Sequence, residues 1–202
     1  MELTQLLKKY RTLPYLDSSR ADSIFPVIGA LCSGGLSVLC LGAGNEGVYE
    51  ALSAAAVTFD SMMLGAEVCD MEMAQSACRA RAKFIISPGL SEEIAQLCSK
   101  QGVRYIPGCA TPTEIMRAQA LGLTTVMLCP AQLLGGEKGV NLFVSMFPRL
   151  KFIVHDTGAD GAGYLDNPRL LACVDRKITE GQLDEIALKS RDTVMKYEKE
   201  LL

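Results

Sequence analysis

The stretch Thr124–Gly136, TTVMLCPAQLLGG, decides the fold of this chain. It begins as an apolar run of β type, is broken by Pro130, and ends in the pair Gly135-Gly136. Two similar blocks lie upstream, RYIPGCATPTEI over 104–115 and FIISPGL over 84–90. Each is a short apolar strand interrupted by proline or glycine, and the blocks at 124 and 104 lead into the start of a helix. The blocks therefore predict strand–helix units that recur along the chain.

The same alternation extends over the whole sequence. Strands that are apolar along their entire length indicate burial on both faces, which is typical of a parallel sheet. We expect eight of them, at 13–16, 36–41, 61–64, 84–87, 104–106, 125–129, 151–155 and 170–174. Eight such units predict an α/β fold, a single (β/α)8 TIM barrel that spans residues 1–202 as one domain. A doubly wound open sheet is the alternative that the spacing leaves open.

Composition and charge narrow the class of protein. The chain has 202 residues, of which 49% are hydrophobic, enough for one large core. Its net charge is −3 and its basic residues form no patch, so we expect no nucleic-acid partner. Eight cysteines form no CxxC pair and lie scattered in apolar runs, which predicts free thiols in a reducing, cytoplasmic setting.

One uncharged segment, Ser23–Asn45, is long enough to span a bilayer. It contains Pro26 and five glycines, and helical spacing in its first half gives way to a β-type run in its second. The pattern predicts a buried helix, a Gly-Gly turn and a buried strand. The beginning of the chain lacks the apolar core of a signal peptide, so we expect no association with a membrane.

The segment Gly42–Gly47, GAGNEG, matches the GxGxxG pattern. It follows a predicted strand and opens a predicted helix, and Glu67 lies twenty residues beyond Gly47, where a ribose-binding acid would stand. In a barrel the same residues form a glycine-rich loop. Dinucleotide binding therefore stays as one alternative function.

The blocks together resemble the 2-keto-3-deoxy-6-phosphogluconate / 4-hydroxy-2-oxoglutarate aldolase family. The similarity rests on SPG at 87–89, PGCATPTE at 107–114, and CPA at 129–131 followed by a Gly-Gly pair, in matching order and spacing. It runs from about Leu13 to Val194. The resemblance implies a TIM barrel, an aldolase-like lyase without a cofactor, and a homotrimer.

The resemblance also implies catalytic positions, and here they are substituted. The family's Schiff-base lysine aligns with Met127, and its acid/base glutamate aligns with Cys40. The arginine that holds the substrate carboxylate aligns with Gly44, and a threonine of the third strand aligns with Glu67. A thioether cannot condense with a keto group, so the family mechanism cannot operate at Met127.

The substrate-binding positions implied by the resemblance are partly retained. The pocket proline is Pro88, and the aromatic residue two positions beyond the lysine becomes Cys129. The phosphate turn after the seventh strand survives only in part, at Thr157 and Gly158. After the eighth strand, the family's Gly-Gly-Ser is replaced by VDR over 174–176, and with the acids Asp156, Asp160 and Asp175 this change disfavours a phosphate ligand.

Two further functional hypotheses follow from these substitutions. The first is a diverged family barrel without Schiff-base activity, a pseudo-enzyme or a barrel that binds a small molecule. The second is an active lyase that acts on a small 2-oxo acid by altered chemistry, assisted by a metal or by Cys and Glu side chains. Five residues are expected to border one mouth: Cys40, Glu67, His155, Asp156 and Asp175. Their spacing defines no metal site, and we predict none. Lys177 is the only other lysine expected near that mouth.

Overall fold

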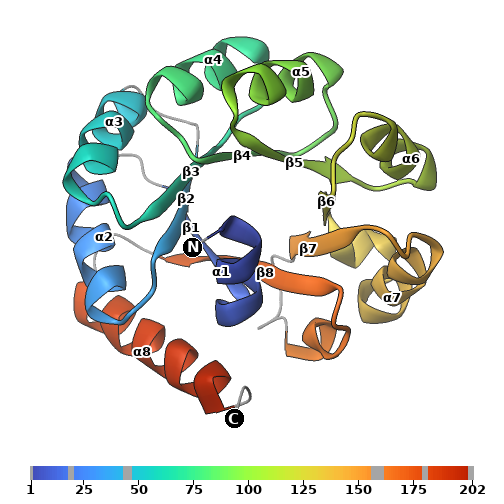
Figure 1. Cartoon of the computed structure of the whole chain (residues 1–202). Coiled ribbons are helices and arrows are strands. Elements are labelled where there is room, and N and C mark those ends of the chain that lie inside the picture. Colours follow the sequence, from blue (N-terminus) through green and yellow to red (C-terminus); the bar gives the residue numbers. More distant parts are fainter. Residues whose placement is uncertain (1, 18–20, 43–46, 156–161, 179–181, 200–202) are drawn as a thin grey trace.

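The structure is a computed structural model that describes residues 2–17, 21–42, 47–155, 162–178 and 182–199. Eight parallel strands form one closed barrel, in which β1 pairs with β2 on one side and with β8 on the other (Figure 1). The strands are β1 (Thr12–Leu16), β2 (Val38–Leu41), β3 (Met63–Glu67), β4 (Phe84–Ser87), β5 (Arg104–Cys109), β6 (Thr125–Leu128), β7 (Lys151–His155) and β8 (Leu170–Ile178). The predicted TIM barrel is confirmed, and the open-sheet alternative is wrong.

Except for the first one, which lies over one end, the helices surround the barrel and bury the outer face of its strands (Figure 1). They are α1 (Leu3–Tyr10), α2 (Ile24–Ser33), α3 (Val48–Thr58), α4 (Met71–Arg79), α5 (Glu92–Gln101), α6 (Pro112–Ala120), α7 (Gly136–Met146) and α8 (Leu183–Lys199). Short 3-10 turns occur at η1 (Ala21–Ser23), η2 (Ala131–Leu134) and η3 (Ala162–Asp166). Among the described helices, none combines the length and the apolar composition needed to cross a bilayer.

A closed barrel has no topological switch point. Dinucleotide-binding motifs lie at such a point of an open sheet, in the crevice where the strand order reverses. Here Gly42 follows the end of β2 and Gly47 precedes α3 in a closed barrel, and residues 43–46 lie outside the described part. The GxGxxG pattern therefore lacks the structural context that the dinucleotide hypothesis needs.

The amino-terminal helix covers one end of the barrel. The helix α1 buries Leu3, Leu6, Leu7 and Tyr10. Glu2 and Leu3 line a cavity of about 530 Å³ together with residues at the beginnings of β3 to β6. Because parallel strands all begin at the same end, α1 lies at the amino-terminal end, and the opposite, carboxyl-terminal end is the mouth where barrels place their sites.

The barrel closes between its first and last strands. Arg11 adopts a left-handed conformation with φ 56° at the end of α1. Its guanidinium donates hydrogen bonds to the carbonyl oxygen of Leu170, at 2.5 Å, and to that of Leu165. Arg11 thus fixes the beginning of β1 to the beginning of β8.

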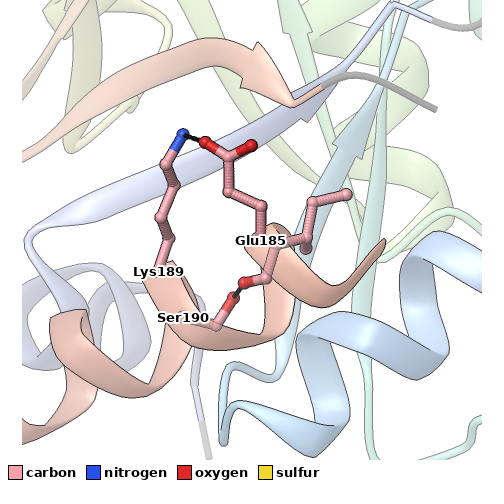
Figure 2. Close-up of polar contacts among 4 residues, drawn as sticks. Glu185, Lys189 and Ser190 are labelled. Carbon is pink, nitrogen blue, oxygen red and sulfur yellow. Dashed lines mark hydrogen bonds and ion pairs between the residues drawn. The ribbon is translucent and has the colours of Figure 1, made fainter. Parts of the chain in front are cut away.

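The last helix packs closely on α2. A Cβ atom added at Gly34 would stand 2.2 Å from the Cβ of Ser190 and 2.6 Å from the carbonyl oxygen of Ala187. The Ser190 hydroxyl is turned back into its own helix and donates to the carbonyl oxygen of Ile186 at 2.7 Å (Figure 2). On the same stretch of α8, exposed Lys189 pairs with Glu185 at 2.5 Å (Figure 2). The short distances from Gly34 to Ser190 and Ala187 leave no room for a side chain, so the close approach of α2 and α8 requires glycine at position 34.

The helix starts agree with the sequence where a local motif defines them. Thr111 caps α6 through a capping box with Glu114, and Asp70 caps α4 by accepting from the Met73 amide at 2.8 Å. Two other helices begin without a side-chain cap. The chain forms the 3-10 turn η1 before it becomes α-helical at Ile24, and α3 begins after Gly47.

Candidate functional site at the barrel mouth

Packing against the helices defines which strand residues face outward. Five side chains of β5 to β7 lie in one cluster with residues of α6 and α7: Cys109, Val126, Leu128, Phe152 and Val154. Side chains alternate between the two faces of a strand, so Met127 faces the barrel interior. By the same alternation, Cys129 and His155 face inward one step closer to the mouth.

The register between strands extends this assignment to the other side of the barrel. Pro107 faces outward with Cys109, and Ser87 pairs with Pro107, so Ile86 faces inward. Glu67 pairs with Ile86 and therefore also faces inward. Glu67 ends β3 and His155 ends β7, so the two side chains approach the mouth from opposite sides of an eight-stranded barrel.

The residues at the predicted catalytic positions Cys40 and Met127 are sealed inside the barrel. Both have no exposed surface, and Cys40 pairs with Tyr15 and Gly65 of the neighbouring strands in the layer below the mouth. The register places Met127 beside Gly108 of β5. Both side chains are part of the buried hydrophobic core.

A tyrosine–glutamate pair lies on the β1–β3 side of the mouth. The Tyr15 hydroxyl donates to Glu67 Oε2 at 2.5 Å, and Tyr15 is 2% exposed, whereas Glu67 is half-buried. Gly42 provides the space for this contact, because a Cβ there would lie 2.6 Å from the Tyr15 hydroxyl oxygen and 2.9 Å from Asp17 Oδ1. Tyr15 was not among the predicted site residues.

A thiol–imidazole pair lies on the β6–β7 side. Cys129 Sγ is 3.3 Å from His155 Nδ1, a hydrogen-bonding distance for sulfur. Both residues are half-buried. Cys129 lies two residues beyond Met127 and His155 two residues beyond Ile153, and Met127 and Ile153 pair in the register of β6 and β7. The structure therefore brings together two residues that the sequence analysis treated separately.

Pro88 lies on the rim of the mouth and is exposed. The backbone behind it is tightly packed, because a Cβ at Gly108 would lie 2.1 Å from the Pro88 carbonyl oxygen. Ser87 and Tyr105 share a hydrogen bond of 2.6 Å on the outer side of this loop. Burial raises the pKa of Tyr105, partly offset by its hydrogen bonds with Ser87 and Ser91.

One acid expected at the mouth faces the other way. Asp175 follows Val174, which pairs with inward-facing His155, so the alternation turns Asp175 outward. Consistent with this, the pKa of Lys189 on α8 is raised by its hydrogen bond to Glu185 and further by the charges of Glu185 and Asp175. Asp175 therefore belongs to the contact of β8 with α8, and the expectation that it borders the mouth is wrong.

Several predicted site residues lie outside the part that the structure describes. These are Gly44, Asp156, Thr157, Gly158 and Asp160. The side chains of Arg176 and Lys177 are likewise not described, although their backbone belongs to β8. Within the described residues, no three His, Cys, Asp or Glu side chains gather in a metal-binding arrangement.

Comparison with known proteins agrees with this architecture. The family model for KDPG and KHG aldolases matches residues 3–192. A 2-dehydro-3-deoxy-phosphogluconate aldolase of Treponema pallidum is 30% identical over 94% of this chain and 95% of its own length. The crystal structure of a 4-hydroxy-2-oxoglutarate/2-dehydro-3-deoxyphosphogluconate aldolase superposes with TM-score 0.85 at 30% identity, covering 96% of this chain and 98% of the other.

A further structure, of Legionella pneumophila KDPG aldolase with pyruvate captured as a covalent carbinolamine, superposes with TM-score 0.84 at 22% identity. It covers 96% of this chain and 98% of the other, and it supports the fold alone. The family match over nearly the whole sequence, the Treponema relative and the closed barrel together show that this chain belongs to the KDPG and KHG aldolase family.

Proposed function

We propose that this chain is a family barrel that binds a small molecule at its carboxyl-terminal mouth without forming a Schiff base on β6. The observation that carries the proposal is the position of Met127. Its side chain points from β6 into the interior of the barrel and has no exposed surface. The Legionella relative captures pyruvate as a carbinolamine, an adduct that requires an amine. A thioether at the corresponding strand position cannot form one.

The lysines of this chain also support the proposal. Among the described lysine side chains, the exposed ones are Lys8, Lys83, Lys100, Lys138, Lys151, Lys189 and Lys196, and Lys9 is half-buried on α1 beside the Tyr10 ring. None of these described side chains enters the mouth. Lys177 is the one candidate that β8 brings toward that end, and the experiment below includes it.

Borohydride trapping with pyruvate, followed by intact-mass measurement, tests the proposal. We expect no added mass on this protein, whereas the Treponema relative serves as a positive control. Peptide mapping then locates any adduct, and an adduct on Lys177 or another lysine would restore a Schiff-base aldolase. A Met127→Lys variant is expected to show no aldol cleavage, because Cys40 supplies no carboxylate for proton transfer, a contribution of about 10²–10⁴ in rate.

A second candidate is an active lyase that acts on a small 2-oxo acid by Cys/Glu-assisted chemistry. The Tyr15–Glu67 and Cys129–His155 pairs favour it, because they place a carboxylate and a thiol at opposite sides of one mouth. A coupled assay for pyruvate release from 4-hydroxy-2-oxoglutarate tests this candidate. Activity that is lost in Glu67→Gln would support it, and activity unaffected by Glu67→Gln and by Cys129→Ser would exclude it.

A further inference from the structure

Among the described residues at the mouth, the thiol–imidazole pair Cys129–His155 has the geometry of a nucleophile and its base. The chain contains eight cysteines and a single histidine. The Nδ1 atom of that histidine is 3.3 Å from Cys129 Sγ, and both side chains are half-buried, so they are screened from bulk water and still reachable. A thiol within hydrogen-bonding distance of an imidazole is the arrangement that generates a thiolate near neutral pH.

Three other described cysteines differ from Cys129 in their surroundings. Cys109 is buried on the outer face of β5, and burial, with a further contribution from Glu114, raises its pKa to about 12. Cys32 is exposed on α2, and partial burial of its sulfur raises its pKa. Cys40 is buried below the mouth and has no exposed surface. Cys129 differs from these three thiols in having the imidazole of His155 within hydrogen-bonding distance.

We propose that Cys129 is a nucleophilic thiol, activated by His155, that captures a small uncharged hydroxyaldehyde at the barrel mouth as a hemithioacetal. This inference rests on the proposed function in one respect, because it takes the mouth to be the ligand site. It goes beyond that function by naming the reacting atom and the chemical class of the ligand.

The step balances without a further reagent. His155 Nδ1 accepts the proton of the Cys129 thiol, and the sulfur forms a bond to the carbonyl carbon of the aldehyde. The π bond of the carbonyl opens, its electron pair moves to oxygen, and this oxygen takes the proton back from the imidazole. Nothing is oxidised or reduced, no group leaves, and the reverse sequence releases the aldehyde and the thiol.

Glu67, on the side of the mouth opposite Cys129, favours an uncharged ligand that carries a hydroxyl group. An ionised carboxylate accepts hydrogen bonds and donates none, so Glu67 suits a ligand hydroxyl. Its negative charge opposes a ligand carboxylate or phosphate at the same place. Tyr15 holds Glu67 through the 2.5 Å hydrogen bond, and Gly42 keeps the space that this contact needs. An aldehyde is also a stronger electrophile than the ketone of a 2-oxo acid.

Site-resolved alkylation of the native protein tests the nucleophile. Iodoacetamide labelling at pH 7, quenched over time and mapped by peptide mass spectrometry, gives a rate for each cysteine. A thiol paired with an imidazole carries a much larger thiolate fraction than a free one, so we expect Cys129 to react about tenfold faster than Cys32. Equal rates, or a slower rate for Cys129, would overturn the proposal. This comparison lies within one protein and needs no variant.

A His155→Gln variant tests the base. We expect the Cys129 rate to fall to that of Cys32, while the Cys32 rate itself stays unchanged. The unchanged Cys32 rate, together with the thermal melting curve, shows that the variant is folded. A Cys129 rate that is unaffected by the substitution would exclude His155 as the activating group.

Protection by an aldehyde tests the ligand class. Glycolaldehyde added before iodoacetamide should slow the labelling of Cys129 several-fold and leave Cys32 unaffected, and dilution of the aldehyde should restore the rate. Equal slowing at both cysteines would mean reaction with thiols in general and would overturn the site. Equal protection by pyruvate would overturn the choice of an uncharged ligand. Borohydride trapping on lysine reports on the proposed function alone, so the two failures are distinguishable.

Discussion

The side chain of Met127 lies in apolar surroundings that suit a thioether and do not suit a charged amine. Met127 is fully buried and packs among apolar neighbours, with Ile153 beside it on β7. An uncharged, flexible thioether fills such a space well. A charged amine at the same position would need a partner, and Met127 belongs to a cluster of apolar side chains.

We expect Met127→Lys to destabilise the protein by roughly 3–5 kcal/mol, because it places an unpaired charge in the barrel core. The matched control is Met127→Leu, which preserves volume and should cost less than about 1.5 kcal/mol. Urea unfolding followed by circular dichroism measures both. Equal stabilities of the two variants would show that the core around position 127 already contains a partner for an ammonium group.

At the scale of elements, the contact between α2 and α8 provides a second test. A Cβ at Gly34 would stand 2.2 Å from Ser190 Cβ, whereas a Cβ at Gly29 in the middle of α2 meets nothing within 4 Å. We expect Gly34→Ala to destabilise by about 1–3 kcal/mol through overpacking. Gly29→Ala should stabilise by up to about 1 kcal/mol, since alanine favours a helix over glycine.

Thermal melting of Gly34→Ala and Gly29→Ala measures the two changes in stability. The double variant tests whether the two changes are independent. The effects should add, because only Gly34 touches α8. A stabilised Gly34→Ala protein would mean that α8 lies further from α2 than described here.

The capping box of α6 makes a pH-dependent contribution to stability. Burial raises the pKa of Glu114, but hydrogen bonds from the Ala110 amide at 2.8 Å and from Thr111 outweigh it and leave the pKa lowered. A depressed pKa in the folded state means that the contribution is present above the unfolded value, near 4.5. It is lost as pH falls through the folded value.

We therefore expect the difference in unfolding free energy between the native protein and Glu114→Gln to be largest at pH 7 and to shrink at acid pH. Denaturant titrations at pH 7 and at about pH 3.5 measure it. Exposed Glu92, also in the first turn of a helix, gives the control variant Glu92→Gln. A difference that stays constant with pH would contradict the role of the ionised carboxylate.

The sequence predicts elements better than it predicts which side chains meet. Local signals were sufficient for the eight strands. The contacts Tyr15–Glu67 and Cys129–His155 depend on which face of a strand is inward, and a strand buried on both faces has no polar–apolar alternation to show it. The same ambiguity placed Asp175 at the mouth, and the register shift between β7 and β8 adds to it.

At the scale of the whole molecule, apolar side chains remain exposed around α6 and α7. Leu133 in η2 is 84% exposed, and Met116 and Leu142 are exposed on α6 and α7. We predict that the chain forms a homotrimer, as the family resemblance implies. Light scattering at micromolar concentration should give three times the chain mass, and Leu133→Asp should reduce it, whereas the control Leu188→Asp on α8 should not. A monomeric native protein would contradict the prediction.

The closure of the barrel between β1 and β8 has a consequence for synthesis on the ribosome. Translation delivers β1 first and β8 last, and Arg11 finds its acceptors at Leu165 and Leu170 only when the final part of the chain has emerged. Until then the nascent sheet has two open edges, at β1 and β7, each able to pair with another polypeptide. Nearly the entire chain must therefore be synthesised before the barrel can close. A polypeptide that ends before Leu170 keeps both unpaired strand edges.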